Sequence, residues 1–228
     1  MREPIVAIDG PAGAGKSTVA RGVASKLGYV YVDTGALYRA VGLAAIRRGI
    51  AFEDDDRLGP LVAGIDIVLG TNDDGTTVVK LDGEDVSSAI RTPEVSAAAS
   101  AVSARGPVRA GLLDLQRRLG GSGGSVLEGR DIGTVVFPDA EVKIFLTATD
   151  EERARRRHAE LVSRRTDVSY EQVLAEQRQR DANDSGRKLA PLKPADDAIQ
   201  LASDGLTVDQ VIAAILTRVE ASRSLPGD

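Results

Sequence analysis

The residues from Gly10 to Ser17 carry the clearest chemical signal in the chain. They read Gly-Pro-Ala-Gly-Ala-Gly-Lys-Ser, which fits the phosphate-binding pattern of a glycine followed, after four residues, by Gly-Lys-Ser or Gly-Lys-Thr. The glycines let several backbone N–H groups point at one anion, and the dipole of the following helix adds positive charge there. Lys16 is expected to reach the outer phosphates of a nucleoside triphosphate, and the Ser17 hydroxyl to ligate Mg²⁺. An ordinary glycine-rich turn is the alternative interpretation.

Two further motifs follow short apolar segments. Asp33-Thr34-Gly35-Ala36-Leu37-Tyr38-Arg39 offers a carboxylate for Mg²⁺ and an arginine for a second phosphate group, although a helix cap followed by a surface arginine is the alternative. Glu128-Gly129-Arg130-Asp131-Ile132-Gly133 places an arginine that can clamp phosphate next to a carboxylate that can accept from an amino group. A structural ion pair is the competing interpretation of Arg130 and Asp131.

A run of arginines lies in the second half of the chain. Arg153, Arg155, Arg156 and Arg157 fall within a helix expected over 151–158, which can fold over a triphosphate as a mobile lid. A solvated helix face is the alternative for each of them. Further along the chain, the same mixture of charges returns in Arg180, Asp184 and Arg187.

The elements that must position these motifs follow from the apolar pattern. The first part of the pattern alternates strands and helices, which predicts a parallel sheet with right-handed crossovers. The expected elements are a strand over 5–9, a helix over 16–27, a strand over 29–33 and a helix over 35–48. Short strands at 65–69, at 76–81 and near Val86, with a turn at 72–75, predict an antiparallel excursion. The remaining predicted elements are helices at 93–104, 107–119, 169–182 and 208–219, strands at 125–127, 142–146 and 198–202, and a disordered tail at 222–228.

Composition excludes several classes of protein. The net charge of −5 argues against a general nucleic-acid binder. The absence of cysteine excludes disulfides and thiolate catalysis, and the only histidine, His158, makes a histidine triad improbable. Because neither a signal peptide nor a membrane span is visible, we expect a cytoplasmic protein, and a monomer because no long apolar helix face is evident.

Taken together, these motifs resemble the bacterial cytidylate kinases, a family of nucleoside monophosphate kinases. The resemblance covers about residues 5–219 and includes Asp82-Gly83-Glu84-Asp85-Val86, the segment 129–140 that begins Gly-Arg-Asp-Ile-Gly, and Ala190-Pro191-Leu192. The phosphate loop alone marks a large superfamily, whereas its combination with Gly-Arg-Asp and the strand-rich insertion is specific to this family. The chain departs from it at Glu128, where members often have Asp, and at Thr34, where several have Ser.

The resemblance implies an α/β P-loop kinase fold. Its parts would be a five-stranded parallel sheet flanked by helices, a small antiparallel β insertion in the monophosphate-binding region, and a helical lid. The chain would form a single unit over 1–228, with its core at about 1–34, 125–150 and 184–222. The monophosphate-binding region with the insertion would cover about 35–124, and the lid about 151–183.

The resemblance also implies roles for individual residues. The triphosphate would lie against Gly10, Pro11, Ala12, Gly13, Ala14, Gly15, Lys16, Ser17 and Thr18, with Mg²⁺ at Ser17 and Asp33. The substrate nucleotide would meet Ser100, Arg109 and Asp131 at the cytosine, Arg180 and Asp184 at the ribose, Arg39, Arg130 and Arg187 at the phosphate, and also Thr34. Lys16, Arg130, Arg157 and Arg187 would be catalytic, Arg157 being a lid arginine.

The implied reaction is transfer of the γ-phosphoryl group of ATP to CMP or dCMP, in pyrimidine nucleotide metabolism. No partner beyond these nucleotides is expected, neither polymeric nucleic acid nor a membrane. Another small-molecule kinase of the superfamily, or a loop that binds but does not transfer, remains an alternative. A GTP-driven switch is disfavoured, because no Asn-Lys-x-Asp guanine-reading motif occurs.

Overall fold

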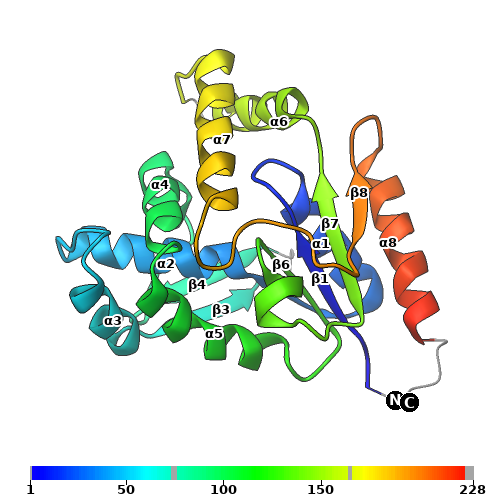
Figure 1. Cartoon of the computed structure of the whole chain (residues 1–228), viewed down its shortest axis with the longest axis horizontal. Helices are drawn as coiled ribbons and strands as arrows, with labels where there is room; N and C mark the ends of the chain where they lie inside the picture. Colours follow the sequence, from blue (N-terminus) through cyan, green and yellow to red (C-terminus); the bar gives the residue numbers. More distant parts are fainter. Residues whose placement is uncertain (1, 73–75, 164–165, 224–228) are drawn as a thin grey trace.

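A five-stranded parallel sheet forms the centre of the molecule (Figure 1). The computed structural model describes residues 2–72, 76–163 and 166–223. The strands are β1 (Ile5–Asp9), β2 (Val30–Asp33), β6 (Ser125–Gly129), β7 (Val142–Thr147) and β8 (Ile199–Ala202). They lie in the order β2-β6-β1-β7-β8, so that β1 pairs with β6 on one side and β7 on the other. The predicted parallel sheet is therefore confirmed.

Helices cover both faces of this sheet. Its central strands β1 and β6 are buried along their whole length and mostly apolar, as is typical of parallel strands with two covered faces. On one face, α1 (Lys16–Leu27) and α8 (Val208–Arg223) share a core with β1, β6 and β7. On the other face, α5 (Gly106–Gly120) and a short π-helical turn, η2 (Ile132–Val136), cover β1, β2 and β6.

A second body lies beside the sheet and has its own core. It comprises α2 (Thr34–Arg47), α3 (Asp55–Gly64), α4 (Pro93–Val102), part of α5, and the antiparallel strands β3 (Ile67–Thr71), β4 (Thr77–Leu81) and β5 (Glu84–Asp85), with a 3₁₀ turn at η1 (Ala89–Arg91). The predicted antiparallel insertion is confirmed. Helix α3 was not predicted, because Gly59 and Pro60 break the helical pattern; buried Leu58 and Leu61 and the Asp54 cap nevertheless stabilise it.

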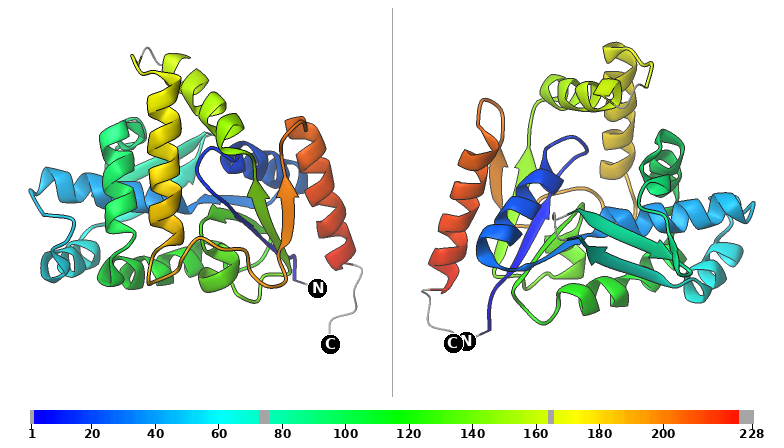
Figure 2. Two further views of the ribbon diagram at one scale, coloured as in Figure 1. Left: turned by 45° about the horizontal axis from the view of Figure 1, so that its top comes forward. Right: turned by 180° about the vertical axis from the view of Figure 1, so that it is seen from behind.

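Two helices rise above the carboxyl edge of the sheet. Figure 1 shows α6 (Asp150–Ser163) and α7 (Tyr170–Ser185) over the phosphate-loop end, and Figure 2 shows the same placement from two further directions. They pack on each other through Ala154, Leu161 and Val173. Both helices end later than predicted. Asp184, which was expected in a polar segment after the second helix, therefore lies within α7.

Two predictions fall on residues outside the described ranges. The turn at 72–75 includes 73–75, and the tail at 222–228 includes 224–228. The tail prediction is wrong for Ser222 and Arg223, because α8 continues to Arg223. Over the described ranges, none of the helices combines the length and the apolar character needed to cross a membrane.

The close crossing of α2 and α4 depends on Gly42. A Cβ at this position would lie 3.0 Å from the backbone nitrogen of Ala99. We expect Gly42→Val to separate the helices and lower the free energy of unfolding by about 1–3 kcal/mol, as overpacked cores do. Urea unfolding followed by circular dichroism measures this. The matched control is Gly64→Val at the end of α3, where a Cβ meets nothing within 4 Å; equal losses in both variants would contradict the packing role of Gly42.

Candidate functional site

The phosphate loop connects β1 to α1 at the carboxyl edge of the sheet. Gly10 has φ 150°, and a Cβ there would lie 2.0 Å from the carbonyl oxygen of Leu146, so only glycine fits. Gly13 has φ 76° and packs under the side chains of Gln177 and Arg153. Gly15 begins α1 without a side-chain cap, which leaves the N–H groups of the first helical turn for a ligand. The loop therefore has the backbone shape that anion binding requires.

Lys16 is buried at the base of this loop. Its Nζ donates to the carbonyl oxygen of Pro11 at 2.8 Å. Burial, with repulsion from Arg130 second, lowers the pKa of Lys16 to about 7. A phosphate bound nearby would favour the ammonium form, so this lysine is suited to pairing with an anion.

Two buried carboxylates lie beside the loop. Asp33 caps α2 by accepting from Ala36 N at 3.0 Å, and its other oxygen pairs with Arg39 at 2.8 Å. Glu128 accepts a 2.5 Å hydrogen bond from the Tyr31 hydroxyl and lies beside the Ser17 hydroxyl. Burial, and then the negative charge of Asp33, raise the pKa of Glu128.

Such a carboxylate pair is suited to a divalent cation. Over the described residues, no group of three or more His, Cys, Asp and Glu side chains could enclose a metal. Mg²⁺ commonly binds through one or two carboxylates together with phosphate oxygens, so the donor set of Ser17, Asp33 and Glu128 fits Mg²⁺ delivered with a nucleotide. Glu128 was not among the predicted ligands, although its place at the end of a strand was a usable signal.

Cationic side chains gather next to Lys16. Arg130 donates to Asp184 at 2.9 Å, and Arg187 donates to the other oxygen of the same carboxylate at 2.5 Å. Burial lowers the pKa of Arg180 to about 10, and the neighbouring charges of Arg130, Arg39 and Arg157 contribute. The Nε atoms of Arg39 and Arg180 are buried without a hydrogen-bond partner. A cluster with this excess of cations has the charge that binding an anion requires.

A second polar pair lies next to this cluster. Arg109, from α5, is hydrogen-bonded to the carboxylate of Asp131, and their side chains are only 12% and 5% exposed. The Arg109 guanidinium also donates to Ser103 O at 3.2 Å and lies over the ring of Tyr38. Ser100, on α4, accepts from Arg187 through its carbonyl oxygen at 3.4 Å. The structure thus brings Ser100 of α4 next to Arg187, and Arg109 of α5 next to Asp131.

Three predicted residues remain: Thr34, Arg157 and Thr18. The Thr34 hydroxyl donates to Glu128 O at 2.7 Å and joins the ends of β2 and β6. Arg157 pairs with Glu160 of its own helix at 2.8 Å, although its charge still acts on Arg180. Thr18 lies exposed in the first turn of α1.

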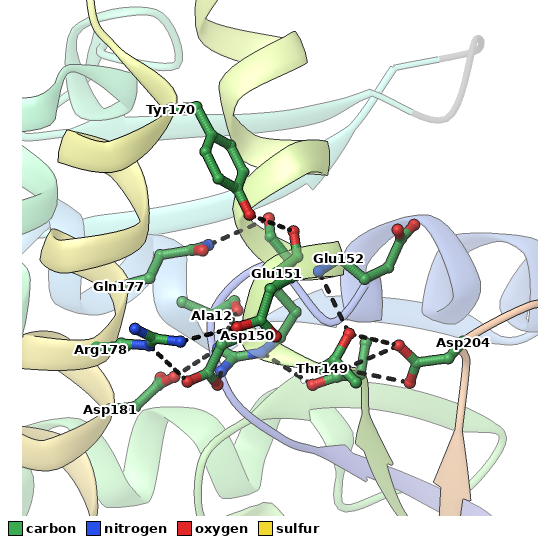
Figure 3. Close-up of polar contacts among 12 residues, drawn as sticks. Ala12, Thr149, Asp150, Glu151, Glu152, Tyr170, Gln177, Arg178, Asp181 and Asp204 are labelled. Carbon is green, nitrogen blue, oxygen red and sulfur yellow. Dashed lines mark hydrogen bonds and ion pairs between the residues drawn. The ribbon is translucent and has the colours of Figure 1, made fainter.

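The arginine run of α6 divides into different roles. Arg153 is 3% exposed and donates to the carbonyl oxygen of Ala12, in the phosphate loop, at 2.9 Å. It also pairs with Asp150 and with Asp181 of α7. Figure 3 shows Ala12, Asp150 and Asp181 gathered between the loop and the two upper helices. The solvated-face interpretation is wrong for Arg153, whereas the exposed Arg155 pairs along its own helix with Glu152.

Comparisons with known proteins agree with this geometry. The model of a family described as cytidylate kinase matches residues 6–221. A cytidylate kinase of Geobacter sulfurreducens is 51% identical over 224 residues, covering 98% of this chain and 96% of the relative. One from Syntrophotalea carbinolica is 53% identical over 215 residues, covering 94% of this chain and 91% of the relative. A solved structure of an uncharacterized protein from Eubacterium ventriosum shares the fold, with TM-score 0.51 at 12% identity over 96% of this chain and 99% of that protein.

Anion binding by the arginine cluster can be tested without a nucleotide substrate. We expect Arg180→Met to weaken binding of inorganic pyrophosphate about tenfold or more, because it removes charge-assisted hydrogen bonds. Isothermal titration calorimetry measures this. Arg178→Met, on the same helix, is the control, since Arg178 is exposed and pairs with Asp150 and Glu151. Equal weakening by both substitutions would mean that only net charge matters.

Proposed function

The chain belongs to the cytidylate kinase family and is a kinase that phosphorylates CMP; we propose that its arginine cluster holds the phosphate of CMP, or of dCMP, in line with the γ-phosphate of ATP. The observation that carries this proposal is the position of the cluster. Arg130 is close enough to Lys16 of the phosphate loop for its charge to lower the pKa of Lys16. In the sequence, Arg130 is followed directly by Asp131 of the second polar pair. Both nucleotides can therefore meet at Arg130.

Cytosine is proposed to bind at Arg109 and Asp131. Its amino group can donate to the Asp131 carboxylate, and its ring nitrogen and carbonyl oxygen can accept from Arg109. Uracil would place a carbonyl oxygen against the carboxylate and an N–H against the guanidinium. Because the pair is buried, a mismatched base leaves polar groups unpaired, and such sites discriminate strongly. Ser100 and Thr34 line the proposed nucleotide site.

The phosphate and the ribose of CMP are proposed to bind in the arginine cluster. Arg39, Arg130 and Arg187 are the proposed phosphate ligands, and Arg180 and Asp184 the proposed ribose ligands. The resting ion pairs of Arg130 and Arg187 with Asp184 keep these guanidinium groups in position. A bound phosphate can then take the free donors of each guanidinium.

Catalysis is proposed to rest on position and charge. A phosphate oxygen is already a nucleophile at neutral pH, so no general base is required. Two unit charges 4 Å apart repel by roughly 4 kcal/mol at an effective dielectric constant near 20. Lys16, Arg130, Arg187 and, after closure of α6 and α7, Arg157 would offset this repulsion. Closure would also exclude water from the γ-phosphate.

Mg²⁺ is the proposed cofactor, held by Ser17, Asp33 and Glu128 with the phosphates of ATP. When bound, it neutralises charge on the β- and γ-phosphates. The Tyr31 hydroxyl keeps Glu128 directed towards Ser17, and the Thr34 hydroxyl holds the adjoining strand end.

The proposal also covers the working units of the chain. The core comprises about 1–34, 125–150 and 184–222, the monophosphate-binding region about 35–124 and the lid about 151–183. We propose a monomer that acts in the cytoplasm, where CMP and ATP are supplied.

Lys16 provides the first test of this function. We expect Lys16→Ala to lower turnover with ATP and CMP by about 10³-fold or more, because charge on the transferred phosphoryl group loses its nearest cation. A coupled assay of ADP release measures turnover, and circular dichroism checks the fold. Lys26→Ala, on the exposed last turn of α1, is the control. Unchanged activity of Lys16→Ala would refute the assigned role of the phosphate loop.

Asp131 provides a test of base selection. We expect Asp131→Ala to lower kcat/KM for CMP and to reduce the ratio of CMP to UMP activity by about tenfold or more, since the amino group loses its acceptor. The same assay with CMP, dCMP, UMP and AMP measures the ratio. Asp114→Ala, exposed on α5, should leave it unchanged. A wild-type ratio in Asp131→Ala would show that another group recognises the base.

A further inference from the structure

Asp9 is a buried carboxylate that none of the proposed roles uses. It is the last residue of β1 and stands immediately before Gly10 of the phosphate loop. Its side chain spans to the segment after β6, where Oδ1 accepts from Ile132 N and Oδ2 accepts from Gly133 N, each at 2.8 Å. One carboxylate therefore bonds two consecutive amides that are more than 120 residues away in sequence.

These bonds hold a short turn at both ends. On its near side, Gly129 pairs with Asp9 in the parallel register of β1 and β6. On its far side, Ile132 and Gly133 are fixed by the Asp9 carboxylate. Only Arg130 and Asp131 lie between the two fixed ends, and these are the proposed ligands of the CMP phosphate and of cytosine.

Burying the Asp9 carboxylate costs free energy, because the charged group loses contact with water. The carboxylate is 5% exposed, and burial raises the pKa of Asp9 to about 6, against the two amide hydrogen bonds that lower it. The nearby Lys143 is not its partner, because Lys143 pairs with Asp197 at 2.7 Å and bonds Pro138 O. An apolar side chain would avoid this desolvation penalty. What the carboxylate provides in return is the pair of hydrogen bonds to the amides of Ile132 and Gly133.

We propose that Asp9 is a positioning residue for the acceptor nucleotide. It sets Arg130 and Asp131 at a constant distance and direction from the phosphate loop. The backbone of Asp9 leads directly into the loop, and its carboxylate holds the turn that contains Arg130 and Asp131. Asp9 contacts neither nucleotide. This inference rests on the proposed function of the Arg130–Asp131 turn.

A merely structural role makes a different prediction. Glu141 offers the matched case, since its Oε2 accepts from Ile5 N at 2.8 Å at the opposite end of the same strand. A carboxylate that only secures β1, as expected of Glu141, should affect stability without affecting the choice of base. A carboxylate that positions the turn should affect recognition of CMP more than binding of ATP.

The experiment compares Asp9→Ala, Asp9→Asn and Glu141→Ala with the wild-type chain. We expect Asp9→Ala to raise KM for CMP about tenfold or more and to lower the CMP-to-UMP ratio of kcat/KM by a similar factor. Affinity for a non-hydrolysable ATP analogue, measured by calorimetry, should change less than threefold. Asp9→Asn should lie between, because its amide offers one acceptor and turns a donor towards the second N–H. Glu141→Ala should keep the wild-type ratio.

Amide hydrogen exchange supplies a readout that does not depend on activity. Residues 130–136 should exchange faster in Asp9→Asn than in the wild-type chain, and β7 should not. Asp9→Asn keeps the size of the side chain, so it serves if Asp9→Ala does not fold. An unchanged CMP-to-UMP ratio and unchanged exchange in Asp9→Asn would overturn the inference. Failure of the wild-type chain to phosphorylate CMP would instead refute the proposed function, and the exchange result would still decide the role of Asp9.

Discussion

Repulsion between two phosphate-bearing nucleotides is the constraint around which this molecule is built. Roughly 4 kcal/mol for each pair of charges must be offset where the phosphates meet. The protein concentrates cations at one edge of its sheet, although its net charge is −5. Burial is the main reason that the pKa values of Lys16 and Arg180 fall to about 7 and about 10, and the positive charge of Arg130 adds to both shifts. Local clustering therefore matters here more than total charge.

The cations are held in place before any ligand binds. Asp184 lies between Arg130 and Arg187, and Asp131 is bonded to Arg109. Breaking one partner out of such a buried pair leaves an uncompensated charge, so each carboxylate limits where its arginine can move. The pairs thus supply preorganisation, and a phosphate bound as proposed would meet guanidinium groups whose directions are already set.

Single polar side chains connect parts of the site that belong to different elements. Arg153 links the phosphate loop, through Ala12, to the two upper helices, α6 and α7. Asp9 links the start of the same loop to the Arg130–Asp131 turn. Both side chains are buried, and both use several hydrogen bonds at once, which suits parts that must keep a constant distance. The phosphate loop is accordingly connected to α6 and α7 on one side and to the Arg130–Asp131 turn on the other.

Local patterns in the sequence were enough for most of the fold and for the phosphate loop. The strands of the large sheet follow from short apolar runs, and the loop from the spacing of Gly10, Gly15 and Lys16, because these signals depend on neighbouring residues only. The pattern failed at α3, where tertiary burial of Leu58 and Leu61 outweighs the effect of Pro60. The resemblance to a family then added Ser100 and Arg109, which no local motif had marked, and grouped them with Asp131, to which no spacing rule connects them.

Only the tertiary structure decided which charged residues face one another. Arg153 and Arg155 are equivalent in the sequence, yet one is buried against the phosphate loop and the other is exposed, since a helix turns about 100° per residue and α7 covers one side. Glu128 became a candidate metal ligand, and Asp9 a positioning residue, because parallel strands bring their carboxyl ends to a common edge. Contacts between residues more than 90 positions apart depend on that chain path, and no local sequence signal encodes them.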